Sequence, residues 1–111
     1  MKTLTLSLSL LLLSGAAFAD APEPGATHRY LIERSFPKGA LDGLDASKKA
    51  KINANNSRYG VHWVTSYANA DETKTYCIYD GPNESAIRQA AVANGIPVDS
   101  VTEVPVSLQP Y

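Results

Sequence analysis

Val61-His62-Trp63-Val64-Thr65-Ser66-Tyr67-Ala68 and Lys74-Thr75-Tyr76-Cys77-Ile78-Tyr79-Asp80 are the two stretches that decide the fold. Their side chains alternate with the period of a β-strand, and the short segment 69–73 between them is suited to a turn, so together they predict a β-hairpin. Large side chains occur on both alternating faces, whereas a small sheet normally keeps one face on a core and the other in water. The second face therefore indicates a partner subunit, a ligand or both.

The alternation divides the hairpin into two predicted faces. A register that places Thr65 opposite Cys77 would also place Trp63 opposite Tyr79 and His62 opposite Asp80. We expect the face with Val64, Tyr76 and Ile78 to pack on helices. We expect the opposite face to be a dimer surface or the wall of a pocket, and it consists of Trp63, Thr65, Tyr67, Cys77 and Tyr79.

The sequence on either side of the hairpin completes an alternating order of elements. Residues 28–36 predict a first strand, and Asp45 is a suitable N-cap for a helix that runs to about Tyr59. Asn83 can cap a second helix that Gly95 ends, and residues 98–106 predict the last strand. The order strand, helix, strand, strand, helix, strand predicts an α+β, ferredoxin-like βαββαβ sandwich. Its antiparallel four-stranded sheet would carry both helices on one face, with the first and third strands central.

The first 19 residues have the features of a secretory signal peptide. Lys2 is followed by a short apolar run, and Ala17-Phe18-Ala19 fits a cleavage site. We therefore expect a periplasmic or secreted protein without a stable membrane anchor after cleavage. The predicted organisation is a signal peptide at 1–19, a flexible lead-in at 20–27, one domain at 28–107 and a tail at 108–111.

Charge and cysteine content exclude some classes of protein. The 111-residue chain has a formal net charge of −1, with 10 basic and 11 acidic side chains, and so lacks the basic surface typical of nucleic-acid binding. Cys77 is the only cysteine, so no disulfide can form within the chain, and we expect this thiol to be buried. A small domain without a disulfide gains stability from dimerisation, which favours a homodimer.

Several blocks of the sequence resemble a known bacterial family. The blocks are Tyr30-Leu31-Ile32-Glu33-Arg34-Ser35-Phe36-Pro37, Tyr59-Gly60-Val61-His62-Trp63-Val64, Lys74-Thr75-Tyr76-Cys77-Ile78-Tyr79, Ala86-Ile87-Arg88 and Val101-Thr102-Glu103-Val104. This small family, named only as an uncharacterised domain, includes a nickel-binding, nickel-responsive actinobacterial protein. The resemblance implies a ferredoxin-like fold, usually paired into a dimer.

The family resemblance also implies a nickel site, but its expected histidines are absent here. The corresponding positions carry Arg34, Lys49, Ile87 and Ala91, which are poor ligands for a metal that prefers nitrogen donors. His62 is then the one candidate metal ligand, for nickel or another divalent transition metal.

The candidate ligand-binding residues come from the first and last predicted strands and from the hairpin. They are Glu33, Arg34, His62, Trp63, Tyr67, Cys77, Tyr79 and Glu103. Arg34 could hold a carboxylate or phosphate through paired hydrogen bonds, and Glu33 or Glu103 could serve as a base or an oxygen ligand. For each of these charged residues, a structural salt bridge or a dimer contact is the alternative.

Three functions remain open from the sequence. The first is an exported, non-enzymatic binding protein, a homodimer that encloses a small ligand or a metal ion at the open face of the sheet. The second is a cofactor-independent enzyme of the dimeric α/β-barrel type, with Glu33, Arg34 and His62 in its pocket; no catalytic residue can be assigned. The third is a module that docks another protein on the open face.

Overall fold

A computed structural model describes residues 26–111 of the chain, so the predicted signal peptide and most of the lead-in lie outside the described residues. The elements follow in the order β1 (His28–Ser35), α2 (Ala46–Ser57), β2 (His62–Ala68), β3 (Lys74–Gly81), α3 (Glu84–Asn94) and β4 (Ser100–Glu103). This is the predicted α+β order. Neither described helix is long and apolar enough to cross a membrane.

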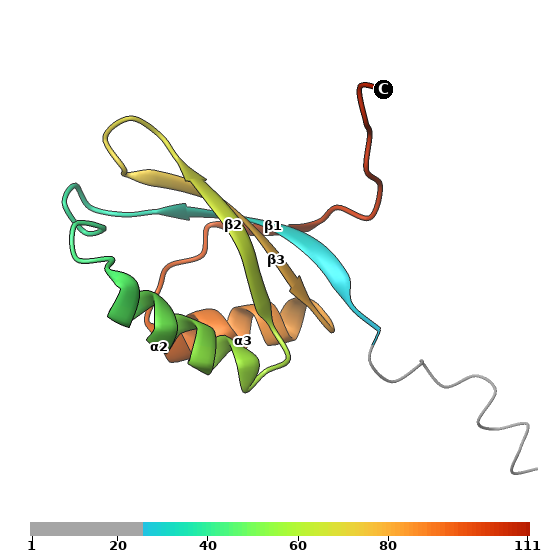
Figure 1. Cartoon of the computed structure of the whole chain (residues 1–111), viewed down its shortest axis with the longest axis horizontal. Helices are drawn as coiled ribbons and strands as arrows, with labels where there is room; N and C mark the ends of the chain where they lie inside the picture. Colours follow the sequence, from blue (N-terminus) through green and yellow to red (C-terminus); the bar gives the residue numbers. More distant parts are fainter. Residues whose placement is uncertain (1–25) are drawn as a thin grey trace, which may run out of the picture.

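The four strands form one sheet in the order β2-β3-β1-β4, and every neighbouring pair is antiparallel. The predicted central position of the first and third strands is confirmed. Both helices lie on the same side of the sheet, and no helix or strand of residues 26–111 covers the other side (Figure 1). We refer to the two sides as the helix face and the open face.

The predicted pairing of β2 with β3 holds at one end and fails in the middle. Trp63 lies opposite Tyr79 and His62 opposite Asp80, as predicted. Thr65 then lies opposite Ile78 rather than Cys77, because the register shifts at a β-bulge between Trp63 and Thr65. One extra residue in a bulge reverses the side of the sheet to which the following side chains point.

The bulge and the position of the core reverse the predicted faces. The buried core includes Cys77 and Tyr79, together with residues of α3 such as Ile87 and Ala90. The face with Cys77, Tyr79 and Trp63 is therefore the helix face, and the expectation that it is the open face, available as a dimer surface, was wrong. The alternative expectation, the wall of a pocket, agrees with the cavity that these residues line. The face with Tyr76 and Ile78, expected to pack on helices, is the open face instead.

The side chains of the central strand β1 also alternate between the helix face and the open face. Tyr30, Ile32 and Arg34 are buried, whereas the residues between them are partly exposed. Leu31 and Glu33 lie opposite Ile78 and Tyr76 of β3, and so belong to the open face. Adjacent residues of one strand thus serve opposite faces, as strand geometry requires.

Helix α3 is firmly fixed to the sheet. The side chain of Asn83 accepts a hydrogen bond from the backbone N–H of Ala86, and Gly95 ends the helix in a left-handed conformation with φ of 66°. Both ends are those that the sequence predicts. The side chains of Ile87 and Ala90 are 1% exposed, which makes α3 the helix that closes the core.

Helix α2 covers the sheet more loosely. Asp45 caps it through a hydrogen bond from the backbone N–H of Lys48, as the sequence predicts. Among its 12 residues only Asn56 is buried. The helix therefore brings few apolar side chains to the sheet, and space remains beneath it.

The last strand is shorter than predicted. Residues 98–106 were expected to pair, but β4 spans only Ser100–Glu103. Pro105 has no backbone N–H to donate, and the chain leaves the sheet just before it. Residues 104–111 extend away from the domain (Figure 1).

Candidate ligand-binding cavity

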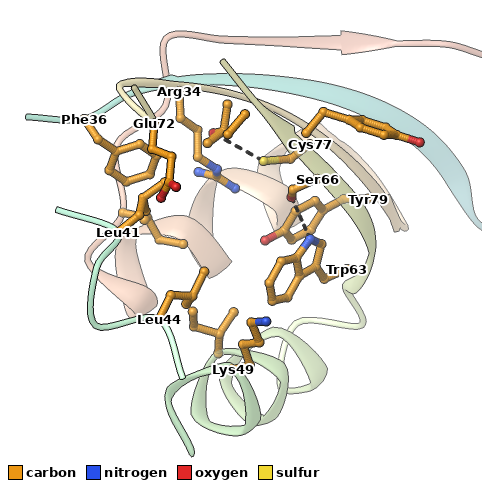
Figure 2. A pocket seen from close by; sticks show the side chains of 15 residues that line it. Arg34, Phe36, Leu41, Leu44, Lys49, Trp63, Ser66, Glu72, Cys77 and Tyr79 are labelled. Carbon is orange, nitrogen blue, oxygen red and sulfur yellow. Dashed lines mark hydrogen bonds between the residues drawn. The ribbon is translucent and has the colours of Figure 1, made fainter. Parts of the chain in front are cut away.

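A cavity of about 360 Å³ lies on the helix face, at the end of the sheet where the segment between β1 and α2 folds over it. Its lining comes from that segment, from α2, from the hairpin and from the end of β1 (Figure 2). The lining includes charged, polar and aromatic side chains as well as leucine: Arg34, Leu44, Lys49, Trp63, Ser66, Glu72, Thr75, Cys77 and Tyr79. A volume of this size is in the range of small-molecule sites.

The guanidinium of Arg34 points into the cavity (Figure 2). Arg34 is only 3% exposed, and its Nη1 donates a hydrogen bond of 2.8 Å to the backbone carbonyl of Pro97. Its Cζ lies 5.5 Å from the centre of the Tyr79 ring, in a cation–π arrangement. Among residues 26–111 no carboxylate forms an ion pair with it. A buried positive charge is therefore left without a counter-ion.

Two aromatic rings make one wall of the cavity. Trp63 and Tyr79 stack with ring centres 6.4 Å apart and ring planes 16° from parallel. The indole N–H of Trp63 donates a 2.8 Å hydrogen bond to the hydroxyl of Ser66, which fixes the orientation of the ring. The bulge makes this hydrogen bond possible, because it places Ser66 on the same side of the sheet as Trp63.

Tyr79 lies deeper than the other aromatic groups of the cavity. Burial raises the pKa of its phenol, and the charge of Cys77 in its thiolate form would raise it further, while Arg34 and Asn56 act in the opposite direction. The net direction is upward, so the phenol is neutral at physiological pH. The cavity therefore offers a hydroxyl group and a fixed positive charge side by side.

Cys77 also belongs to the cavity wall. Its thiol is buried, as expected, and lies 3.5 Å from the hydroxyl of Thr75. Both side chains point to the helix face because β3 places every second residue there. Together with Ser66 they give the wall a weakly polar strip.

The remaining lining is mainly apolar, and the charged groups at its edge are of both signs. Phe36, Leu41, Leu44, Ile52 and Ile96 surround the polar strip. Lys49 of α2 and Glu72 of the hairpin turn also line the cavity. Glu72 has a left-handed backbone with φ of 59°, which is uncommon for a residue other than glycine.

Three of the predicted site residues lie elsewhere. Glu33 is on the open face, where it accepts a hydrogen bond from Ser100 and lies 3.7 Å from the ammonium group of Lys74. His62 is exposed, and Glu103 pairs with His28 at the edge strand. The expected pocket of Glu33, Arg34 and His62 was wrong, since Arg34 points to the helix face and Glu33 to the other.

His62 lies opposite Asp80, but the hydrogen bonds of that carboxylate come from another residue. Both carboxylate oxygens of Asp80 accept hydrogen bonds from Arg29, at 2.8 and 2.9 Å. These bonds lower the pKa of the Asp80 carboxyl, with a smaller contribution from the charge of His62. Within the described part of the chain, no three His, Cys, Asp or Glu side chains come together as ligands for a metal ion. The donor set of one copy therefore does not fit a nickel site.

The other predicted residues are brought together. Arg34, Trp63, Cys77 and Tyr79 all line the cavity, and Tyr67 reaches its rim although its side chain is 67% exposed. Sequence reasoning missed Ser66, because it assigned this residue to the opposite face. It also missed Leu41, Leu44 and Lys49, and the one available signal was a pair of leucines in an otherwise turn-like segment.

Comparison with known proteins places the chain in a family. Residues 30–104 match the family described as nickel responsive protein SCO4226-like. The chain belongs to this family. The expected family resemblance, which ran over the same part of the sequence, is therefore confirmed.

A solved structure supports the fold. The crystal structure of SCO4226 from Streptomyces coelicolor A3(2) is similar to this chain with a TM-score of 0.62 and 21% sequence identity. The match covers 72% of this chain and 99% of the other. Identity at this level carries the fold and not the ligand. No curated protein matches the chain.

Proposed function

We propose that this protein is a non-enzymatic binding protein that holds a small molecule in the cavity between α2 and the sheet. The observation that carries the proposal is the buried guanidinium of Arg34, which points into an otherwise mostly apolar space and has no carboxylate partner among the described residues. A few convergent polar groups on apolar walls are typical of ligand sites. This position replaces the open face, where the sequence placed the ligand.

The assembly and the compartment are further parts of the proposal. We take the protein to be a homodimer that pairs through its open face, since Val64, Tyr67 and Tyr76 are at least 40% exposed. We also take it to be exported, because of the signal-like sequence at its N-terminus. Docking of a different protein on the open face is the alternative use of the same surface.

The name of the family raises nickel as a second ligand. The described residues of a single copy do not supply a set of three donors for it. His28 is paired with Glu103 alone, and His62 has as its neighbour Asp80, whose carboxylate is occupied by Arg29. We therefore leave nickel out of the proposed function. Titration of the purified protein with nickel, followed by calorimetry, checks this choice, and stoichiometric binding at micromolar concentrations would contradict it.

Native mass spectrometry tests the proposed function. The protein is expressed with its own N-terminus, purified from the periplasm without denaturation, and compared with a Leu44→Trp variant that fills the cavity. We expect an added small-molecule mass on the wild type that the variant lacks. Gln89→Trp, on the exposed side of α3 and outside the cavity lining, is the matched control and should keep the added mass. Wild-type protein that carries no small molecule, and takes up none from a cell extract, would refute the proposal.

A further inference from the structure

The cavity contains an imbalance of charge. Two cationic side chains, Arg34 and Lys49, and one anionic side chain, Glu72, are the charged groups that line it. Arg34 is the buried one, while Lys49 and Glu72 are exposed to solvent, which screens their charges. The inner part of the cavity is therefore positive.

The guanidinium has hydrogen-bond donors to spare. Arginine carries five N–H donors, and the described contacts of Arg34 satisfy one of them through Pro97. A buried charge without a partner is costly, and the cost falls when a ligand supplies the opposite charge. The planar arrangement of the remaining donors matches the two oxygens of a carboxylate.

The apolar walls of the cavity limit the chemical character of the rest of the ligand. Leu41 and Leu44 lie across the cavity from the stacked pair of Trp63 and Tyr79 (Figure 2), so the space beyond the guanidinium is bounded by carbon on both sides. Ile52 adds a further apolar side chain to the lining. An inorganic anion such as phosphate would leave these walls in contact with water. A single carboxylate on an apolar body satisfies the charge and the walls together.

We propose that the ligand is a small organic monocarboxylate, whose carboxylate pairs with Arg34 and whose apolar body lies between Trp63 and the leucines of the segment before α2. This inference rests on the proposed function and adds the class of ligand to it. One carboxylate matches the one buried cation. A ring or a short alkyl chain fills the same space, and the two differ in how they contact the indole ring.

Trp63 provides the measurement, since it is the only tryptophan of the chain and lines the cavity. Purified protein is titrated with phenylacetate, with hexanoate and with phenylacetamide, and the fluorescence of Trp63 is recorded. Phenylacetamide has nearly the shape of phenylacetate but no charge. We expect saturable binding of at least one of the two acids. The dissociation constant of phenylacetamide should be at least about tenfold higher than that of phenylacetate.

Substitutions on β1 separate the two arginines. Arg34→Gln should weaken binding of the acids by about tenfold or more, to the level of the amide, and Arg34→Lys should restore part of the loss. Arg29→Gln is the matched control, because Arg29 lies on the same strand but on the open face. It should leave the affinity unchanged.

The outcomes distinguish the ligand class from the function. Equal affinity for phenylacetate and phenylacetamide would overturn the inference while leaving a binding cavity in place, and this comparison does not depend on whether Arg34→Gln folds. Strong quenching by inorganic phosphate with no response to either acid would also overturn it. If native mass spectrometry finds a bound neutral compound, the proposed function stands and the monocarboxylate fails.

Discussion

Arg29 and Arg34 belong to the same strand, and their positive charges have different surroundings on the two faces of the sheet. Arg29 is paired with Asp80 on the open face and remains half exposed, whereas Arg34 is buried beside Tyr79 and lacks a carboxylate partner. The paired arginine is explained by the folded chain alone. The unpaired one is the arginine for which we propose a ligand as the partner.

The pair of Arg29 and Asp80 leads to a prediction about pH. Hydrogen bonds from Arg29 hold the pKa of Asp80 below its ordinary value of 3.8. A carboxyl whose pKa is depressed by folding contributes stability above its unfolded pKa, and the contribution is lost as the pH falls through the folded value. We expect Arg29→Gln to lower the free energy of unfolding at neutral pH, and the difference from wild type to shrink on acidification below about pH 4. Urea unfolding across this range measures the effect; a difference independent of pH would contradict it.

At the scale of elements, α3 fixes the domain and α2 closes the cavity only in part. Ile87 of α3 is 1% exposed and belongs to the core, while Val92 of the same helix is 81% exposed. Ile87→Ala should therefore destabilise the protein by about 2–5 kcal/mol through lost burial and the hole that remains. Val92→Ala should change the stability by less than about 0.5 kcal/mol. Urea unfolding of both variants checks the pair, and similar losses would show that α3 is not oriented as described.

The elements were predictable from the sequence, and the face of the hairpin was not. Caps such as Asn83 and Gly95 are local signals, and they placed α3 at the observed ends. The bulge after Trp63 has no such local signal in the sequence. The side chains alternate both before and after it, and large side chains would be buried in either register. Which face became the core was decided by the fit of Cys77 and Tyr79 against α3. For the same reason the sequence placed the ligand on the open face, although the candidates Arg34, Trp63, Cys77 and Tyr79 do line one cavity.

At the scale of the whole molecule, no element of the described part of the chain covers the open face. Leu31 and Ile78 lie opposite each other in its centre, and Tyr76, which is 40% exposed, borders them. If two copies pair through this face, Ile78→Lys places two charges in the interface and should shift the protein to monomers. Gln89→Lys lies on the exposed side of α3, away from the open face, and should keep the dimer. Light scattering after gel filtration distinguishes the masses, and a wild-type protein that is already monomeric would refute the pairing.

The central claim is that ligand binds on the helix face, beneath α2, and not on the open face. It is tested most directly by a titration of isotopically labelled protein with phenylacetate, followed through the N–H resonances of the Trp63 indole and of the two β1 arginine side chains. The proposed site predicts saturable shifts of Trp63 and Arg34 with the same affinity, while the Arg29 resonance stays in place. Shifts at Arg29 alone, with Trp63 and Arg34 unmoved, would place the ligand on the open face and contradict the account.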